Sequence, residues 1–452
     1  MTQNILDNLQ PKLSVTARII RDISEYDNYC HDATIETGLP SAIIFVQNEE
    51  DIIAVIQFCI AHNIPFVPRG AGTGLSGGAV PKNGGVVIAL EEMNTLTIDA
   101  SNKIAYAQTG VITKDIIDEA SKLQLFYPPD PASYEESTIG GNVAENAGGL
   151  KCVKYGVTKD YVLGIKGITS EGRLLETGIY NTSVGFDFNE IFIGSEGTLI
   201  IITEVALKLI DATESGETIL TAFDSAKDAA QTVSDIRMDG ITPIVMEFLD
   251  GDAAACSNSY ERNDSLDNVA AILLIEAEKN HAEKIEQLCQ KNKCTYINRQ
   301  TDPEKAVNLW KVRRNLSKAV KELSKVRISE DVAVPISKFP VLVDFVADMN
   351  KRSSLRINSF GHAGDGNLHV NFMGQTGTDS EMQEIEIEIE RLLEKAISLG
   401  GTLSGEHGIG LAKKKYLHLE FDNHLLEAMK RIKYTFDSSS LLNPDKIFEK
   451  TV

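Results

Sequence analysis

The stretch Pro68-Arg-Gly-Ala-Gly-Thr-Gly-Leu-Ser-Gly-Gly-Ala-Val-Pro81 decides the fold. It follows the apolar run Ile64–Val67 and concentrates glycine in one short loop. Glycine lets the backbone approach a ligand closely, and successive free N–H groups form a concavity that binds anions. A plain flexible loop is the competing interpretation. The density of glycines between two apolar runs favours a loop that holds the diphosphate of a nucleotide cofactor.

The cofactor is not expected to be NAD in a Rossmann fold. Three glycines of the loop match the spacing G-x-G-x-x-G, and Glu91 follows the next apolar run. That fingerprint must open a helix whose N-terminus holds the phosphates. Pro81 and the pair Gly84-Gly85 leave no room for such a helix before the next strand. We therefore expect loop amides alone to hold the phosphates.

Two further glycine-rich regions follow, namely Tyr127–Ser133 with Ser137–Gly149, and then Ile193–Ile200. Together with the first loop they resemble the FAD-binding domain of the vanillyl-alcohol-oxidase-type flavoproteins. In that family the first loop lies on the pyrophosphate, the second segment lies along the diphosphate and flavin, and the third lies near the adenosine. Some relatives attach the flavin to a histidine in the first loop. This loop has none, so we expect noncovalent FAD.

Carried over by position, the resemblance implies a set of FAD-contacting residues from all three segments. These residues are Pro68, Arg69, Gly70, Ala71, Gly72, Thr73, Gly74, Ser76, Gly77, Gly78, Pro129, Ser133, Thr138, Gly141, Asn142, Gly148, Glu196 and Gly197.

Composition restricts the class of protein. The 452 residues suffice for two or three domains, and 42% hydrophobic with 24% charged residues is ordinary for a globular chain. A net charge of −21 argues against nucleic acid and anionic membranes as partners. Because no apolar window could span a bilayer and the first residues lack signal-peptide features, we expect a cytoplasmic protein, peripheral to a membrane only through a partner.

The six cysteines form no C-x-x-C pair, and we expect them to be free thiols. An iron–sulfur centre would then have to belong to another polypeptide.

We expect an α+β fold in three parts: an FAD-binding domain over 1–212, a substrate- and metal-binding cap over 213–425, and a helical segment over 426–452 that returns toward the FAD domain. Apolar spacing predicts a helical lead-in over residues 5–30. The order of strands and helices in the cap predicts an antiparallel sheet with helices on one face. Residues Thr198–Leu209 are typical of paired strands.

A second set of chemically informative residues lies in Ser359–Phe372 and Ser404–Gly410. On a strand, His369 and Asn371 share one face, and a turn at Gly364–Asn367 would place His362 on the adjacent strand. Any one of these histidines alone is more often structural. Two histidines with one carboxylate, for which Glu406 is the candidate, could hold Zn²⁺, Mn²⁺ or Fe²⁺ with open positions.

These segments resemble the D-2-hydroxyacid dehydrogenase branch of the same family, which includes D-lactate dehydrogenases, glycolate oxidase catalytic subunits and D-2-hydroxyglutarate dehydrogenases. The resemblance implies that a metal is held by His362, His369 and Glu406, that His407 is the base, and that Asn371 lies near the substrate. It also implies that Arg313 grips the substrate carboxylate, with Arg314 as the alternative.

The implied chemistry is the oxidation of a 2-hydroxy acid. The acid chelates a metal, the metal lowers the hydroxyl pKa, His407 accepts the proton, and hydride passes to FAD. Hydroxyglutarate enzymes of the branch carry a lysine shortly before the strand that here is Asp331–Pro335, where this chain has Ile328-Ser-Glu-Asp331. We expect Glu330 to repel a second carboxylate, which favours D-lactate, glycolate or a similar monocarboxylic acid.

Several alternatives stay open at this stage. They are a D-2-hydroxyglutarate dehydrogenase, an electron-transfer flavoprotein subunit without substrate chemistry of its own, and a metallohydrolase. The electron acceptor is open among an iron–sulfur subunit, electron-transferring flavoprotein, quinone and cytochrome.

Overall fold

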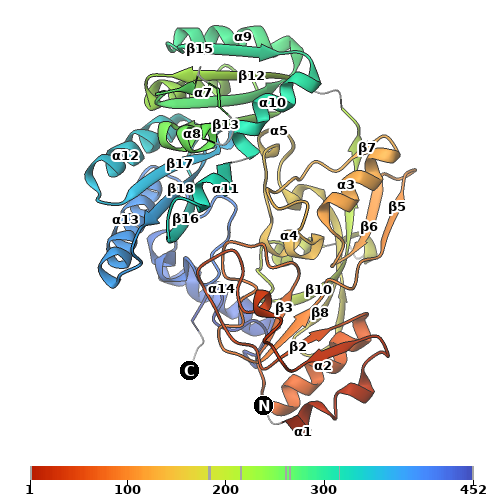
Figure 1. The fold of residues 1–452 in the computed structure, drawn as a ribbon. Helices are drawn as coiled ribbons and strands as arrows, with labels where there is room; N and C mark the ends of the chain where they lie inside the picture. The colour runs from red at the N-terminus through yellow and green to blue at the C-terminus, as the bar shows by residue number, and fades with distance from the viewer. Residues whose placement is uncertain are drawn as a thin grey trace. The chain divides into compact units, whose positions relative to one another are not determined.

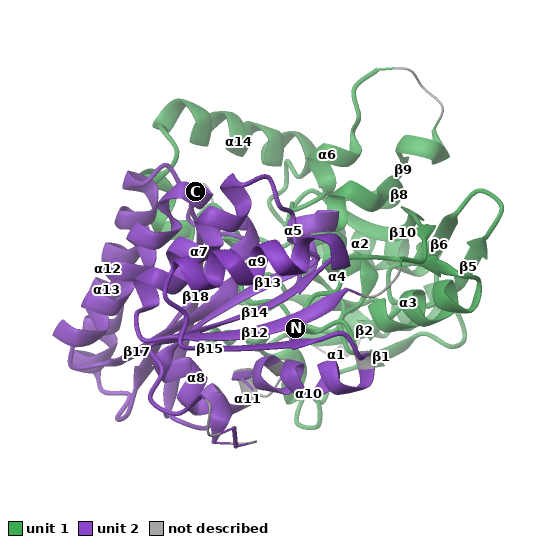
Figure 2. Ribbon diagram, turned by 90° about the horizontal axis from the view of Figure 1, so that it is seen from above, with its two compact units in different colours: residues 1–148, 157–213, 406–452 green, residues 149–156, 214–405 purple. Residues whose placement is uncertain are grey.

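The computed structural model describes residues 3–181, 185–213, 216–259, 262–263, 266–314 and 316–449, without the side chains of residues 3, 4, 303, 314, 317, 318 and 321. The chain divides into two compact units, coloured separately in Figure 2. Unit 1 contains residues 1–148, 157–213 and 406–452, and unit 2 contains residues 149–156 and 214–405. The last stretch of unit 1 begins at residue 406.

Unit 1 begins with a small sheet that carries the first glycine loop (Figure 1). Its strand order is β1 (Arg18–Ile20), β2 (Ala42–Phe45), β4 (Val86–Ala89) and β3 (Phe66–Arg69). Strands β2, β4 and β3 are parallel, and β1 pairs antiparallel with β2 at the edge. Helix α2 (Glu49–His62) packs on this sheet through an apolar face, and the Asn48 side chain caps it by accepting from Asp51 N.

The expected helical lead-in over residues 5–30 is wrong. The region holds only helix α1 (Gln3–Leu6), the 3-10 turns η1 (Gln10–Lys12) and η2 (Asp27–Tyr29), and strand β1. Pro11 cannot donate a backbone hydrogen bond inside a continuing helix, and η1 accordingly carries this proline at its start. Residues 18–20 instead gain hydrogen bonds from β2, an interaction that helical periodicity cannot reveal.

The second sheet of unit 1 has the order β5 (Leu96–Asp99), β6 (Ile104–Gln108), β10 (Ile200–Lys208), β8 (Val162–Thr169) and β9 (Leu174–Glu176). Residues 200–208 form one long central strand rather than two paired strands, and this strand pairs antiparallel with both β6 and β8. The other elements of unit 1 are α3 (Thr113–Lys122), β7 (Leu125–Phe126), α4 (Ile139–Glu145), η3 (Thr158–Tyr161), η4 (Gly178–Tyr180), α6 (Asn189–Phe192), β11 (Ile210–Asp211), η8 (Lys414–Leu419) and α14 (Asn423–Phe436).

Unit 2 is built on a seven-stranded sheet in which every neighbouring pair is antiparallel. The strand order is β15 (Tyr296–Gln300), β12 (Glu217–Phe223), β14 (Ala271–Ala277), β13 (Val245–Asp250), β17 (Arg356–His362), β18 (Asn367–Gly374) and β16 (Val326–Ala333). The antiparallel arrangement agrees with the sequence prediction.

Helices cover both faces of this sheet, not one face as expected (Figure 2). One face carries α7 (Ala226–Met238), α9 (Lys279–Lys291), α12 (Phe339–Arg352) and α13 (Asp379–Ser398), and the other carries α8 (Gly251–Asn258), α10 (Pro303–Arg314) and α11 (Leu316–Lys321). The reason is the strands themselves, because β12 and β18 are buried at every residue. The remaining elements of unit 2 are α5 (Cys152–Tyr155), η6 (Ile336–Lys338) and η7 (Ala363–Asp365).

Among the described residues, no helix combines the length and apolar character that crossing a bilayer requires. All six cysteines are free, as expected.

Candidate functional site

The glycine loop after β3 runs to β4 without an α-helix, as the sequence predicts. The backbone reaches φ +72 at Gly72 and φ +85 at Gly77, a region that glycine occupies without strain. The side chain of Arg69, at the end of β3, packs against the loop, because a Cβ on Gly72 would meet its Nη2 at 2.0 Å. The Arg69 guanidinium donates to the carbonyl oxygens of Asn28 (2.6 Å) and His31 (2.9 Å). We therefore assign Arg69 a supporting role.

The three predicted FAD segments converge within unit 1. A Cβ on Gly70 would meet Thr138 Oγ1 at 2.1 Å, so the first loop lies directly against the second segment. The third segment joins them through the backbone, because Glu196 N donates to Ala144 O at 2.8 Å. A Cβ on Gly197 would lie 3.0 Å from the Pro68 ring. The structure thus brings together glycine segments that are far apart in sequence.

The second segment includes helix α4, which the sequence analysis did not identify. Asn142 lies on this helix and is buried, and its Nδ2 donates to Thr113 Oγ1 at 2.7 Å. Pro129 and Ser133 lie in the loop before the helix, and Gly148 lies after it.

Two glycines of these segments have few neighbours around an added Cβ, which fits a bound dinucleotide. A Cβ on Gly74 would have only the Glu145 carboxyl group within 4 Å, with Oε1 at 3.8 Å. A Cβ on Gly141 would have only Thr138 Oγ1 within that distance, at 3.3 Å. Glycine at these positions keeps side chains out of the cradle, the region where the three glycine segments meet, so backbone N–H groups can approach an anionic ligand. The residues present therefore fit the diphosphate of FAD.

A C-terminal segment contributes to the cradle in a way the sequence analysis missed. Asn443 Nδ2 donates to Gly78 O (3.0 Å) and to Glu196 O (2.9 Å), which ties the first and third segments together. Lys446 Nζ donates to Val80 O at 2.6 Å, and burial lowers the pKa of this lysine to about 8. The sequence signal was a polar Asn-Pro-Asp-Lys stretch after the last helix, which resembles an ordinary loop.

The loop that contains Glu406 and His407 docks on the same cradle of unit 1. Leu411 N donates to Ser76 O at 2.7 Å, and Ile409 N donates to Glu196 Oε1 at 2.8 Å. Gly408 has φ +88, so residues 404–410 follow an irregular path, as their glycines predict.

Two carboxyl groups lie against this loop, Glu196, which is buried, and Glu145, which is half-buried. Burial raises the pKa of Glu196 to about 7, and burial together with the charge of Glu196 raises the pKa of Glu145 well above its ordinary value. A Cβ on Gly408 would meet an oxygen of each, at 2.7 Å for Glu145 and 3.0 Å for Glu196. The backbone of the His407 loop therefore lies directly against two acids whose pKa values are raised.

The two predicted metal-binding histidines lie together in unit 2. His362 ends β17 and His369 lies on the adjacent strand β18, as expected. Their ring centroids are 5.3 Å apart with the planes nearly perpendicular, and both side chains are buried. Asp331 of β16 lies opposite His369 in the antiparallel register, so a carboxyl group shares this face of the sheet.

Glu247 on β13 contacts two predicted site residues, and the sequence analysis missed it. Its Oε1 lies 2.6 Å from His362 Nδ1, and its Oε2 accepts from Arg313 Nε at 2.6 Å. Burial would raise the pKa of Glu247, but the charges of His362 and Arg313 lower it to about 2, so the group is a carboxylate. The only signal in the sequence was one acid inside the apolar strand Val245–Leu249.

Arg313 therefore lies at the predicted site, on α10 and largely buried, with its Cζ 5.2 Å from the Phe360 ring centroid. The alternative, Arg314, is the last residue of α10, and its side chain lies outside the described part of the structure.

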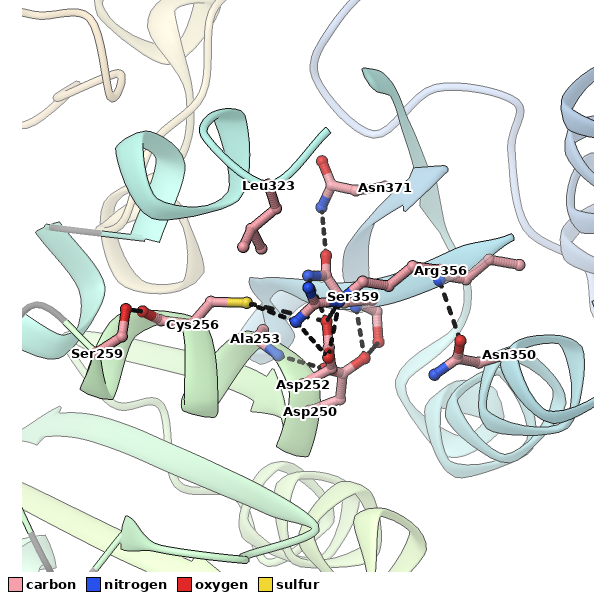
Figure 3. Close-up of polar contacts among 12 residues, drawn as sticks. Asp250, Asp252, Ala253, Cys256, Ser259, Leu323, Asn350, Arg356, Ser359 and Asn371 are labelled. Carbon is pink, nitrogen blue, oxygen red and sulfur yellow. Dashed lines mark hydrogen bonds and ion pairs between the residues drawn. The ribbon is translucent and has the colours of Figure 1, made fainter. Parts of the chain in front are cut away.

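Asn371 lies on the same face of β18 as His369 and is fully buried. Figure 3 shows the Asn371 amide directed toward the cluster that contains Asp252 and Arg356. Its Nδ2 donates to Asn358 Oδ1 at 3.0 Å, and Asn358 Nδ2 donates to Asp252 Oδ2 at 3.1 Å. Asp252 is held in turn by Arg356, whose Nη2 donates to Oδ1 at 2.8 Å. A carboxylate can only accept, so this chain of donors fixes both amides and directs Asn371 Oδ1 away from Asn358.

Glu330 does not lie on the face of the sheet where it could meet the substrate. The register places Glu330 opposite Val370, whereas Ser329 is opposite Asn371. Alternate residues of a strand point to opposite faces, so Glu330 is on the face of the sheet away from His369 and Asn371. The expectation that Glu330 would repel a second carboxylate of the substrate is therefore wrong, because adjacency in sequence becomes opposite orientation in a strand.

The donor set of unit 2 fits a divalent metal ion. Because Glu247 engages Nδ1 of His362, Nε2 is the ring nitrogen that would bind a metal. Histidine ligands commonly donate their other ring N–H to a carboxylate, which orients the ring and raises its basicity. His362 with Glu247 matches this pattern.

Two family models match most of the chain. Residues 40–178 match the family described as FAD binding domain, and residues 212–447 match the family described as FAD linked oxidases, C-terminal domain. The chain is 39% identical over 432 residues to glycolate oxidase subunit GlcD of Bacillus subtilis (strain 168), covering 93% of this chain and 92% of that protein.

Other relatives match nearly the whole chain. D-lactate dehydrogenase of Anaerostipes hadrus is 33% identical, covering 94% of this chain and 93% of that protein. D-2-hydroxyglutarate dehydrogenase of Stutzerimonas stutzeri (strain A1501) is 30% identical, covering 98% of each. Among solved structures, p-cresol methylhydroxylase with substrate bound has a TM-score of 0.78 at 16% identity, covering 100% of this chain and 98% of that chain, which shows a shared fold.

Proposed function

Because this chain belongs to the FAD-linked oxidases, in the D-2-hydroxyacid dehydrogenase branch of the vanillyl-alcohol-oxidase-type flavoproteins, we propose that it oxidises D-lactate or glycolate to the 2-keto acid. The observation that carries the proposal is the shared carboxylate of Glu247. It joins a histidine suited to a metal, His362, to an arginine suited to a carboxylate, Arg313. A 2-hydroxy acid needs both groups at once.

The residues of unit 2 account for binding and orientation. Arg313 gives its Nε to Glu247, so its two terminal nitrogens remain to grip the substrate carboxylate as a fork. The buried histidine pair supplies neutral nitrogen ligands to an ion that, when bound, would lower the pKa of the substrate hydroxyl. Asn371, whose amide is held by Asn358, would lie near the bound substrate.

Glu406 and His407 complete the proposed set, as third metal ligand and base. Gly405 lies against the site in unit 2, because a Cβ on it would meet Asn367 Nδ2 at 1.7 Å and Asp331 Oδ2 at 3.1 Å. Ser404 Oγ donates to Asp331 Oδ1 at 3.2 Å. Glu406 follows Gly405 directly in the chain. The proposed roles of Glu406 and His407 otherwise rest on the family resemblance of the segment Ser404–Gly410. His407 would accept the hydroxyl proton while FAD, when bound, accepts the hydride from C2.

The choice of substrate rests on the relatives. The glycolate oxidase subunit shares more identity with this chain than the hydroxyglutarate dehydrogenase does, at 39% against 30%. D-2-hydroxyglutarate remains the second candidate, because Glu330 faces away from the histidine pair and so does not oppose a second carboxylate. We further propose that, if the electrons leave through an iron–sulfur centre, this centre belongs to another polypeptide, since the cysteines include no C-x-x-C pair.

Product analysis tests this proposal. The purified protein should convert D-lactate or glycolate to pyruvate or glyoxylate with an artificial dye as electron acceptor. An Arg313→Met variant should lose turnover through a raised KM and a lowered kcat, because the carboxylate grip orients the acid in both the ground state and the transition state. Dye reduction without formation of a keto acid would contradict the proposal.

A further inference from the structure

We propose that Glu247 is a positioning residue that couples metal binding at His362 to carboxylate binding at Arg313. The inference rests on the proposed function and deepens it. It names a residue that touches neither substrate nor metal but sets the orientation of a group that binds each.

The geometry supports this role. Glu247 and His362 are directly opposite each other on β13 and β17, so the backbone register itself places the carboxylate beside the ring. Glu247 is fully buried, and both of its oxygens are engaged at 2.6 Å, one by each partner. A buried carboxylate with a separate charged or ionisable partner on each oxygen has little freedom to rotate.

Each contact with Glu247 orients its partner for one kind of ligand. When the neutral ring of His362 donates its Nδ1–H to Glu247, its lone pair is on Nε2, so Glu247 favours the tautomer that can bind a metal. An Nε–H donated to the same carboxylate fixes the plane of the Arg313 guanidinium and leaves the two terminal nitrogens for a ligand. The orientation of both His362 and Arg313 depends on Glu247. A bound metal should therefore change the affinity for the carboxylate, and a bound carboxylate should change the affinity for the metal by the same factor.

Glu247→Gln tests the proposal without altering shape. An amide offers one oxygen and one NH₂ group, so it cannot accept from both His362 and Arg313. We expect the dissociation constant for Zn²⁺ or Mn²⁺ to rise 10- to 100-fold, the range found when a supporting partner of a metal ligand is lost. Retained metal is measured by mass spectrometry after dialysis against graded chelator, on flavin-loaded protein.

A second arm needs no metal and no turnover. Propionate carries the carboxylate of the substrate but no hydroxyl, and its binding can be followed through the flavin absorbance of metal-stripped protein. Glu247→Gln should weaken propionate binding about tenfold, because Arg313 loses its anchor. Glu247→Asp, which keeps a carboxylate, should restore part of both affinities.

Glu217→Gln is the matched control. Glu217 is a buried carboxylate on β12 of the same sheet, and it accepts from Arg299 Nε at 2.6 Å. Its loss breaks an equivalent ion pair away from the histidines, so neither metal nor propionate affinity should change. This comparison separates positioning from general loss of stability.

The outcomes are distinguishable. A folded Glu247→Gln protein that keeps metal and propionate affinities within twofold of wild type would overturn the role of Glu247 and leave the proposed function standing. If that variant does not fold, Arg313→Gln decides, because it removes the anchor of Glu247 without removing a metal ligand. Metal affinity should then fall several-fold, and an unchanged value would overturn the coupling. Wild-type protein that binds no divalent ion would contradict the metal assignment itself.

Discussion

Replacing Gly74 by valine should abolish FAD binding while leaving the protein folded. The backbone at Gly74 has an ordinary φ, and the nearest heavy atom to an added Cβ is Glu145 Oε1 at 3.8 Å. That distance is normal van der Waals contact, so we expect the free energy of unfolding of flavin-free protein to change by less than about 1 kcal/mol. A branched side chain in the diphosphate position should cost at least about 100-fold in FAD affinity, or about 2.8 kcal/mol.

Gly85→Ala is the control for a glycine that serves the fold. Gly85 has φ +82, and a Cβ there would lie 2.1 Å from Pro65 O. We expect this variant to lose about 2 kcal/mol or more of stability but to retain FAD when folded. The assay is titration of flavin-free protein with FAD, followed by flavin fluorescence, together with urea unfolding of the same preparations.

The pair of variants makes the reasoning refutable. A Gly74→Val protein that binds FAD with wild-type affinity would mean that the phosphates do not lie at this loop. A Gly74→Val protein that unfolds as readily as Gly85→Ala would mean that the fold, rather than a bound ligand, requires glycine at position 74.

Three further predictions follow from the two sites. His407→Ala should keep FAD and metal but slow flavin reduction about 100-fold or more, whereas His369→Ala should lose the metal. Metal analysis together with stopped-flow measurement of flavin reduction checks both variants. The reverse pattern would mean that His369 is the base and His407 the metal ligand. Ser329→Lys should raise kcat/KM for D-2-hydroxyglutarate relative to D-lactate, and Glu330→Lys should not, because Ser329 lies on the same face of the sheet as Asn371 and Glu330 does not. Equal effects of the two variants would contradict this assignment of faces. The raised pKa of Glu196 favours its protonated form in the fold, so this stabilisation is complete below pH 4.5 and is lost as pH rises through about 7. Glu196→Gln should remove up to about 3 kcal/mol of that loss, measured as the difference in urea unfolding between pH 5 and pH 8, and identical pH profiles would contradict the assignment.

The sequence predicted the features that depend on local pattern. The glycine loop without a helix after β3, the antiparallel sheet of unit 2, and the placement of His362 and His369 on adjacent strands all follow from residue type and spacing. These features need only the period of a strand and the conformational freedom of glycine.

Features that depend on long-range pairing were missed or mistaken. Glu247 is separated from Arg313 by 66 residues and from His362 by 115, so no local pattern connects them. Glu330 shares a strand with Asp331 but points to the other face, which only the register reveals. Residues 18–20 became an edge strand because β2 offered partners that helical spacing could not indicate.

Anaerobic mixing with D-lactate, L-lactate and glycolate tests the central claim most directly. Our account predicts that D-lactate or glycolate bleaches the flavin absorbance within a catalytic turnover, that L-lactate does not, and that Arg313→Met suppresses the bleaching. A flavin that stays oxidised with every 2-hydroxy acid, in metal-loaded protein that contains FAD, would contradict it.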